Sequence, residues 1–500
     1  MPVLERLIEW WNPAAAHERA VHRLHLDQLR GYQSGEAGRL TQDWMPTGVS
    51  PNQAQQLGAH LTLRRSRDMG RNNAWAAAIY RRLPAAIVGY QVTAGVTAEG
   101  KRARQAVADD WAWFRDQGNA AGPRGPNWDA EVARMVRTVV EAGDCLIVWN
   151  FRPASEGRRI PLTWRALPPD YVDATRIQPS SPDNAVIGGA EVTPEGLTAG
   201  WWLYERHPLD TLHGRPVQSR FYAAEHVDLL YEPLWLGQRR GVPWLAPVAV
   251  DLDDQAQYEK AALWKARMAA SFGLIRRRAG MAGSQLGQAG KDAKGRDTLK
   301  LSPAAILDLP PGDEMTQITP PADDNFRTFW ETRNFAIAAG VGLPVHMVSG
   351  DLSKANYSSL REGKLLFWDL VDQWQWHMVY DQLLRSAWRR FGEARFAAGR
   401  TTGGILPGVE WAFPKRPWVD PAKDIAAVEA ELDLGLTTWP DSVAARGMDP
   451  EEQAARIEQW NPRLVELGMP VGRGRVQRPK ATTATAATDP AAVEGAQPQT

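Results

Sequence analysis

The sequence predicts an α+β protein built from several subdomains. Its 500 residues exceed what a single hydrophobic core usually organises. In the first half, segments with helical spacing and short aromatic strands alternate without the regularity of βαβ units. The second half carries capped helices separated by a polar loop that Gly and Pro interrupt. These three observations favour mixed helix and strand in separate units.

Composition sets limits on the class of protein. Apolar residues make up 44% of the chain, and its 23 tryptophans indicate large buried surfaces, although a coding bias towards Ala and Arg would also raise the tryptophan count. The 58 basic and 58 acidic residues cancel, which argues against a strong static grip on nucleic acid. A single cysteine, Cys145, excludes an intramolecular disulfide. No apolar run reaches the roughly 18 residues of a membrane span.

The first 245 residues divide into an arm and a mixed region. Residues 1–59 are expected to form an N-terminal arm that begins with a short amphipathic helix. From 60 to 245 we expect helices at 61–83, ended by Pro84, and at 101–117 and 128–142, and then a strand at 144–151 that buries Cys145. Further short strands are predicted at PLTWRAL, GWWLYER, SRFYAAE and HVDLLYEP.

Two helices flank a basic insertion. The first is predicted at 246–271, with a face of small residues that suits close helix packing. The second is predicted at about 323–339, within a unit at 322–342, where Asp323 or Asp324 caps its start and Gly340 stops it. Between them, 272–321 combines a flexible Gly/Ser/Ala-rich middle with the strand-like AAILDLPPGDEMTQI. Its basic side chains include Arg276, Arg277, Arg278, Lys291 and Lys294.

A polar loop and a long helix follow. Residues 343–358 are predicted to lack secondary structure, and long loops of this kind inside compact domains are usually functional. Their polar side chains include Ser349, Asp351, Ser353, Lys354 and Asn356. The capping-box pattern from Ser359 to Glu362 predicts a long helix that runs to Gly392, within a unit at 359–419.

The last part of the chain is expected to form a small helical module at 420–470 and a disordered tail at 471–500. Asp420 and Asp449 each precede a proline, as helix N-caps do, and Gly435 and Gly447 would end the helices.

No catalytic motif is visible. The phosphate-binding GxxxxGK[ST], the GxSxG nucleophile turn and the HExxH metal motif are all absent, so we predict neither an enzyme nor a cofactor. Asp251, Asp253 and Asp254 offer carboxylates of the kind that hold divalent cations. The alternative is an acidic first turn that suits the positive end of the 246–271 helix, and we therefore predict no metal site.

Five segments of the chain carry a family resemblance: LRRSRDMGRNNAWAAA, GQRRGVPWLAPV, QYEKAALWKARMAASFG, the run from 313 to 368, and RPWVDPAKDIAAVEAELDLGLTTWPDSVAARGMDPEE. Through them the chain resembles, from about residue 60 to 460, the lambda-type portal proteins of tailed bacteriophages. The resemblance implies a multi-domain portal-type protomer with an α/β wing at 60–245, a two-helix stem, a small clip at 272–321, a channel loop at 343–358, a long wing helix and a helical crown.

The resemblance also implies function and partners. Such proteins form homo-oligomeric rings, expected here as dodecamers, at one capsid vertex, and double-stranded DNA passes through them without sequence specificity. The implied partners are the terminase large subunit, the head–tail connector, and the major capsid and scaffold proteins. The expected location is the virion, after assembly in the host cytoplasm and with no membrane contact.

The expected mechanism is conduction of DNA without tight binding. Lys354 and its polar neighbours would touch phosphates briefly, while carboxylates of the stem would repel them. These carboxylates are Asp251, Asp253, Asp254, Asp323 and Asp324.

Two other functions remain open from the sequence: a metal-dependent DNA-processing enzyme that uses Asp251 to Asp254, and a minor capsid protein without a pore.

Overall fold

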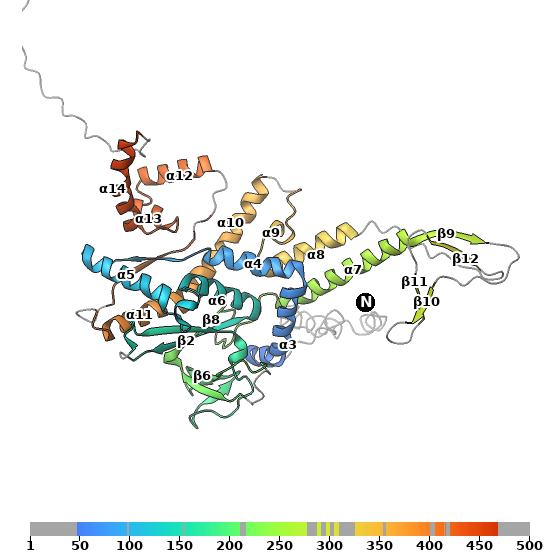
Figure 1. Cartoon of the computed structure of the whole chain (residues 1–500), viewed down its shortest axis with the longest axis horizontal. Helices are drawn as coiled ribbons and strands as arrows, with labels where there is room; N and C mark the ends of the chain where they lie inside the picture. Colours follow the sequence, from blue (N-terminus) through green and yellow to red (C-terminus); the bar gives the residue numbers. More distant parts are fainter. Residues whose placement is uncertain are drawn as a thin grey trace, which may run out of the picture.

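A body of sheets and helices and a projecting two-helix arm make up the described part of the chain (Figure 1). The computed structural model describes residues 48–97, 100–153, 156–210, 217–277, 288–291, 297–300, 305–309, 326–353, 357–400, 406–414, 416 and 421–468. The mixture of helix and strand confirms the coarse fold class.

The two larger sheets of the body are both antiparallel. In the three-stranded sheet, β2 (Asp144–Phe151) is central, between β3 (Leu162–Leu167) and β8 (Val227–Tyr231). The four-stranded sheet has the order β4-β5-β6-β7. Its strands are β4 (Ala185–Ile187), β5 (Ala190–Val192), β6 (Thr198–Tyr204) and β7 (Ser219–Ala223). The strand predicted at 144–151 is confirmed, as is the burial of Cys145, which is 2% exposed.

Helices α5 (Lys101–Gln117) and α6 (Trp128–Ala142) have the predicted bounds. The α6 helix packs against β2 and β8, and its buried residues repeat at helical spacing. A cluster of aromatic rings fills the space between α5, α6, the sheet and the later helices, with ring centroids 4.9–6.4 Å apart. Its members are Trp111, Phe114, Trp128, Trp164, Trp388, Phe391 and Trp411. The tryptophan-rich composition therefore reflects a buried core, at least in the described residues.

The helix predicted at 61–83 is wrong in its bounds. Two helices, α3 (Pro51–Asn72) and α4 (Ala74–Val88), meet at Asn73, whose side chain accepts hydrogen bonds from the backbone N–H groups of residues 75 and 76 at 2.9 and 3.1 Å. Pro84 lies inside α4 and does not end it. Leu83 and Ile87 on the same helix are fully buried. The stability gained from this packing outweighs the loss of the one backbone hydrogen bond that proline cannot donate.

The arm consists of α7 (Ala249–Ser271) and α8 (Phe326–Val341), and α7 follows a single 3-10 turn, η7 (Ala246–Val248). At its far end lie short strands in two pairs, parallel β9 with β12 and antiparallel β10 with β11 (Figure 1). Their bounds are β9 (Phe272–Arg277), β10 (Gln288–Lys291), β11 (Asp297–Lys300) and β12 (Ala305–Leu309).

Gly340 does not end the second arm helix, contrary to the prediction. It lies inside α8, and a Cβ atom there would come within 2.3 Å of Val248 Cγ1. Glycine is needed at this position because α8 crosses η7 so closely. The helix ends at Val341, and Gly342 then takes a positive φ of 69°.

The polar loop and the long helix also differ from the predictions. Part of the loop forms a short helix, α9 (Val345–Ser349). The long helix begins at Tyr357 as α10 (Tyr357–Gln373), so Ser359 lies inside it and is not its cap. It continues as a π-helical segment, η8 (Trp374–Leu384), and as α11 (Arg385–Ala397), which runs through Gly392. A Cβ atom at Gly392 would meet Leu406 Cδ1 at 1.8 Å, so this glycine permits a close contact.

The C-terminal helical module contains α12 (Pro421–Asp433), α13 (Trp439–Ala444) and α14 (Pro450–Glu466). Asp449 caps α14 as predicted, and Gly435 and Gly447 take positive φ angles of 69° and 73° after the preceding helices. Asp420 lies outside the described residues. The module contacts β1 (Thr93–Val96), where Thr93 Oγ1 donates to the Gly447 carbonyl at 3.0 Å. The strand β1 itself pairs with β13 (Val409–Ala412).

Candidate functional site

The candidate site is the arm, the loop that follows it, and the junction that anchors both to the body. Aromatic stacking holds the two arm helices together: the ring of Tyr258 on α7 lies 5.6 Å from Phe326 and 4.4 Å from Phe329 on α8, centroid to centroid. Trp330 of α8 meets Trp75 of α4 edge-on at 5.5 Å. The base of the arm is therefore packed against the body.

Carboxylates on α7 form polar links across the arm. Asp251 makes an ion pair with Arg333 of α8, and Glu259 accepts a hydrogen bond from the indole N–H of Trp330 at 3.1 Å. Asp253 is exposed and accepts from Gln257 Nε2 at 2.6 Å, and Asp254 is exposed as well. Asp251 is thus partly neutralised within the protomer, while Asp253 and Asp254 leave negative charge on the surface of α7.

Two buried polar side chains interrupt the base of the arm. Gln255 of α7 and Asn334 of α8 are each 1% exposed. Among the described residues, Gln255 Oε1 and both polar side-chain atoms of Asn334 have no hydrogen-bond partner. Burying an unsatisfied polar group costs roughly 1–3 kcal/mol, so these two side chains lower the stability of the base of the arm.

The loop after α8 is held in shape by α9. Val348 of α9 is 2% exposed, and α9 packs against α8 and α4. Ser349 Oγ donates to the Val345 carbonyl at 3.0 Å and accepts from Asp351 N–H at 3.1 Å. The carboxylate of Asp351 accepts from Ser353 N–H at 2.8 Å. Gly350, with φ of 72°, turns the chain out of the helix. The loop is therefore a short structured turn up to residue 353.

Two cationic side chains lie near α9. The pKa of His346 lies below its usual value because of burial and because Lys364 of α10 and Arg82 of α4 are nearby cations. Burial and the two cations thus favour the neutral form of this imidazole. Sequence reasoning singled out neither Lys364 nor Arg82, because their positions on two distant helices give no local signal that both approach this loop.

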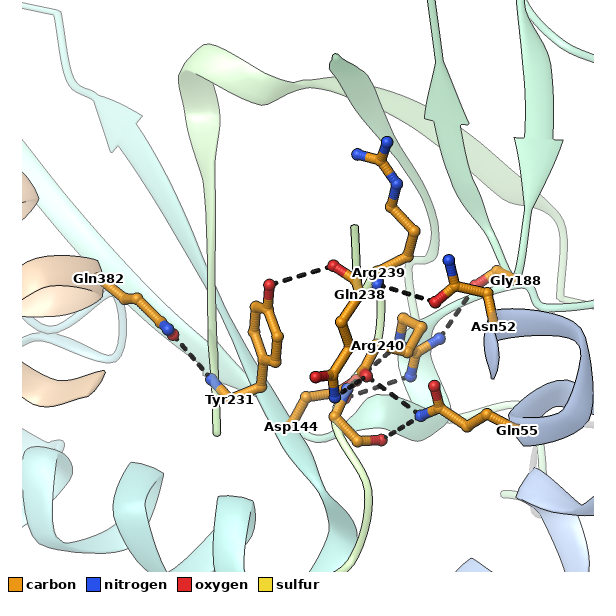
Figure 2. Close-up of polar contacts among 10 residues, drawn as sticks. Asn52, Gln55, Asp144, Gly188, Tyr231, Gln238, Arg239, Arg240 and Gln382 are labelled. Atoms are coloured by element: carbon orange, nitrogen blue, oxygen red, sulfur yellow. Dashed lines mark hydrogen bonds and ion pairs between the residues drawn. The ribbon is translucent and has the colours of Figure 1, made fainter. Parts of the chain in front are cut away.

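A buried ion pair anchors the segment that leads into the arm (Figure 2). Arg240 Nε lies 2.6 Å from Asp144 Oδ2, and the same carboxylate accepts from Gly241 N–H at 3.0 Å. Arg240 Nη1 also donates to the Gly188 carbonyl at 3.0 Å. Strand β2 of the three-stranded sheet is thereby joined both to the four-stranded sheet and to the segment that leads into α7.

Amide side chains complete this junction. Gln55 of α3 donates to the carbonyl oxygens of Arg240 and Gly241 at 3.1 and 2.6 Å, and Gln238 Nε2 donates to the Arg240 carbonyl at 2.8 Å (Figure 2). Gly241 approaches Gly143 so closely that a Cβ atom would come within 1.9 Å of the Gly143 carbonyl oxygen. Only glycine fits there, which explains the RGVP sequence at this point.

The structure places only some of the predicted site residues. Of the loop residues, Ser349, Asp351 and Ser353 are joined by the hydrogen bonds above, whereas Lys354 and Asn356 lie outside the described residues. Asp323, Asp324, Arg278 and Lys294 also lie outside them. Arg276 and Arg277 are in β9 and Lys291 is in β10, and only their backbone positions are described. Asp251, Asp253 and Asp254 share the first turns of α7.

Two properties of the described residues bear on the alternatives. No three His, Cys, Asp or Glu side chains among them gather closely enough to hold a metal ion, and Asp251 is engaged by Arg333. No helix in the described part of the chain combines the length and the apolar character that crossing a membrane requires.

Comparison with known proteins decides the family. The sequence pattern described as "Phage portal protein, lambda family" matches residues 37–375, which is more than half of the chain. The chain belongs to the lambda family of phage portal proteins. This portal-family chain is also 24% identical over 454 residues to the "Probable portal protein" of Halomonas phage phiHAP-1, a match that covers 85% of this chain and 84% of the relative.

The portal-family chain also shows similarity to solved structures of gene transfer agent particles. One is a chain in the virion of the native particle, with 13% identity, coverage of 84% of this chain and 99% of that one, and a TM-score of 0.38. Another is a chain in the neck of the empty particle, with 16% identity, coverage of 77% and 93%, and a TM-score of 0.37.

Proposed function

We propose that this chain is the subunit of a closed ring, expected to be a dodecamer, which sits at one capsid vertex and conducts double-stranded DNA during packaging and ejection. In the same proposal, the ring docks the terminase large subunit and later the head–tail connector, and it is built into the shell alongside the major capsid and scaffold proteins. The observation that carries the proposal is membership of the lambda portal family over residues 37–375.

The shape of the protomer is compatible with this role. Its arm projects from the body and carries short strands at its tip, and both arm helices are rooted beside the α9 turn (Figure 1). We assign the arm to the stem, its tip to the clip, and residues 343–358 to the loop that faces the channel. Family membership points to a structural rather than an enzymatic role.

We infer that the channel repels DNA phosphates more than it binds them. Asp253 and Asp254 leave exposed negative charge on α7, whereas Asp251 is neutralised by Arg333. Lys354 in the loop would add brief attraction, screened over about 8 Å at physiological salt. The alternative function, a metal-dependent DNA-processing enzyme, has no support from the described carboxylates, because they form no group of three that could hold a metal ion.

Electron microscopy of the purified chain tests the ring. We expect closed rings with a central hole, and we expect light scattering on the same sample to give a mass near twelve copies. A protein that stays monomeric at micromolar concentration, or particles without a hole, would contradict the proposal. Particles without a hole would instead support the minor capsid protein that forms no pore.

A substitution in the loop tests the channel. Lys354→Ala removes the only lysine of the segment 343–358, so we expect ring assembly to be unchanged and DNA packaging or retention to fall several-fold. The measurement is packaged DNA per particle in a complementation assay. The control is Lys101→Ala, which removes an exposed lysine at the start of α5. Equal packaging by the two variants would argue against a role of Lys354 in the channel.

A further inference from the structure

An arginine-rich cluster at the other end of the body carries a second inference. Asp110 of α5 is completely buried and meets three arginines from separate segments of the chain. Arg159 Nε lies 2.6 Å from Asp110 Oδ1, Arg395 Nε lies 2.9 Å from Oδ2, and Arg400 contacts both oxygens at 2.7 and 2.9 Å. Both carboxylate oxygens are therefore occupied.

The cluster holds more positive than negative charge. Three guanidinium groups face the single carboxylate of Asp110, which leaves two positive charges in excess. Because the whole chain has no net charge, this excess is local. Asp109, the next carboxylate along α5, is exposed and accepts from Gln105 instead.

Several donors of the cluster have no partner. Within the described residues, Arg159 and Arg395 bond Asp110 only through Nε, and their Nη groups make no hydrogen bond. The side chain of Arg395 is 3% exposed, whereas those of Arg159 and Arg400 are 35% and 37% exposed, so the cluster runs from the core to the surface. The Nη donors of Arg159 and Arg395 are therefore available to an oxyanion that approaches from solvent.

The geometry and the charge select the chemistry of the missing acceptor. Planar guanidinium groups bind oxyanions through pairs of N–H donors, and a phosphate offers at least two charged oxygens to neighbouring arginines. A further single carboxylate would leave much of the excess charge unneutralised. We propose that Arg159, Arg395 and Arg400 form a phosphate-binding site, with the Asp110 carboxylate holding the three guanidinium groups in place.

This site is separate from the arm. Figure 1 shows α5 and α11 at the end of the body opposite the strands β9 and β12. The phosphate would be either free inorganic phosphate or a backbone phosphate of DNA, since the recognised group is the same. The inference does not depend on ring formation, so its test and the test of the proposed function fail independently.

Binding of inorganic phosphate to the full-length protein tests the site. Titration calorimetry at constant ionic strength, with chloride as the replaced anion, should show saturable binding by the wild-type chain. Arg400→Gln should weaken it about tenfold, because a charge-assisted contact is lost. Arg400→Lys should recover part of the loss, since it restores the charge without the planar fork. Arg395 and Arg159 still hold Asp110 in both variants, and circular dichroism checks their fold.

The matched control is Arg389→Gln, which removes an exposed arginine of α11 that pairs with Glu393. Its phosphate affinity should stay within about twofold of wild type. Absence of saturable binding by the wild type, or equal affinities for Arg400→Gln and Arg389→Gln, would overturn the site.

Fluorescence anisotropy with a short DNA duplex at fixed salt identifies the source of the phosphate. A parallel loss of duplex and inorganic phosphate binding in Arg400→Gln assigns the site to the DNA backbone. Loss of inorganic phosphate binding alone assigns it to the free ion. Tighter binding of an acidic peptide than of either phosphate probe would contradict the proposed specificity.

Discussion

At the scale of single residues, buried polar groups are what tie the body together. Glu191 of β5 is completely buried, yet it accepts hydrogen bonds from Ser180 N–H and Oγ–H at 2.7 and 2.6 Å, from Asn184 at 2.8 Å and from the Trp202 indole at 3.1 Å. Burial raises the pKa of this carboxyl, but the hydrogen bonds outweigh it and lower the pKa to about 2. One charged side chain thus fixes the loop before β4 to the sheet.

The depressed pKa makes a prediction about pH. Because the folded pKa is below that of an unfolded Glu, the ionised carboxylate stabilises the fold above about pH 4.5, and this contribution disappears as the pH falls towards 2. We expect Glu191→Gln to lower the free energy of unfolding by about 3 kcal/mol at pH 7. The difference from wild type should shrink between pH 4.5 and 2, as measured by urea denaturation at several pH values.

The control for this prediction is Glu429→Gln, which changes an exposed glutamate of α12 and should leave the stability within about 0.5 kcal/mol of wild type. A stability difference for Glu191→Gln that stays constant down to pH 2 would show that the loss comes from packing rather than from charge.

At the scale of elements, the sequence predicted local features well and distant contacts poorly. The bounds of α5 and α6 and the strand β2 followed from spacing and flanking residues. Pro84, Gly340 and Gly392 misled because each lies inside a helix, where tertiary packing decides. Gly340 and Gly392 permit close approach to Val248 and Leu406, and neither contact leaves a signal in the neighbouring sequence.

The π-helical segment η8 could not be foreseen for the same reason. Three of its side chains bond different parts of the body: Trp374 Nε1 donates to Glu232 at 2.8 Å, Gln375 donates to the carbonyl of Ile87 at 2.8 Å, and Gln382 accepts from Tyr231 N–H at 2.9 Å. Wider helical turns change which side chains face the body. The partners of η8 come from α4 and from the end of β8, far away in the sequence.

The arm helices provide a prediction at this scale. Asn334 of α8 is buried, and both of its polar side-chain atoms are unpaired within the described residues, so Asn334→Leu should raise the free energy of unfolding by about 1–2 kcal/mol. The measurement is chemical denaturation of the purified protein. Phe335→Leu, at an exposed position next to it, is the control and should change little. A destabilised Asn334→Leu variant would mean that the amide has hydrogen-bond partners in solution, such as buried water.

At the scale of the whole molecule, one hydrophobic core joins the body to the base of the arm. It includes residues of α4, α6, β2 and α11 together with Leu252 of α7 and Ile337 of α8. The sequence indicated the units in the chain but not this shared core. Arg240 and Asp144 are 96 positions apart, and no pattern in either segment reveals their pairing. Of the candidate site, the resemblance supplied the loop and the arm, whereas the junction emerged from the fold.

The shared core predicts that the outer arm is dispensable for folding. Replacing residues 263–329 with a short Gly/Ser linker keeps Leu252 and Ile337, so we expect the body to unfold within about 5 °C of the full chain. Differential scanning calorimetry measures this, and replacing 471–500 with the same linker is the control. Collapse of the body transition in the shortened protein would show that the tip contributes to the core. The same variant should lose DNA passage if the arm lines the channel.

The close crossing of Gly340 over Val248 has a mechanical consequence. Both ends of the arm enter the body at the same place, one through the Asp144–Arg240 junction and the other through the final turns of α8. Tension applied at the tip would consequently be divided between these two attachments. A protomer built in this way would transmit a force from the tip of its arm to its body with little deformation at the base of the arm.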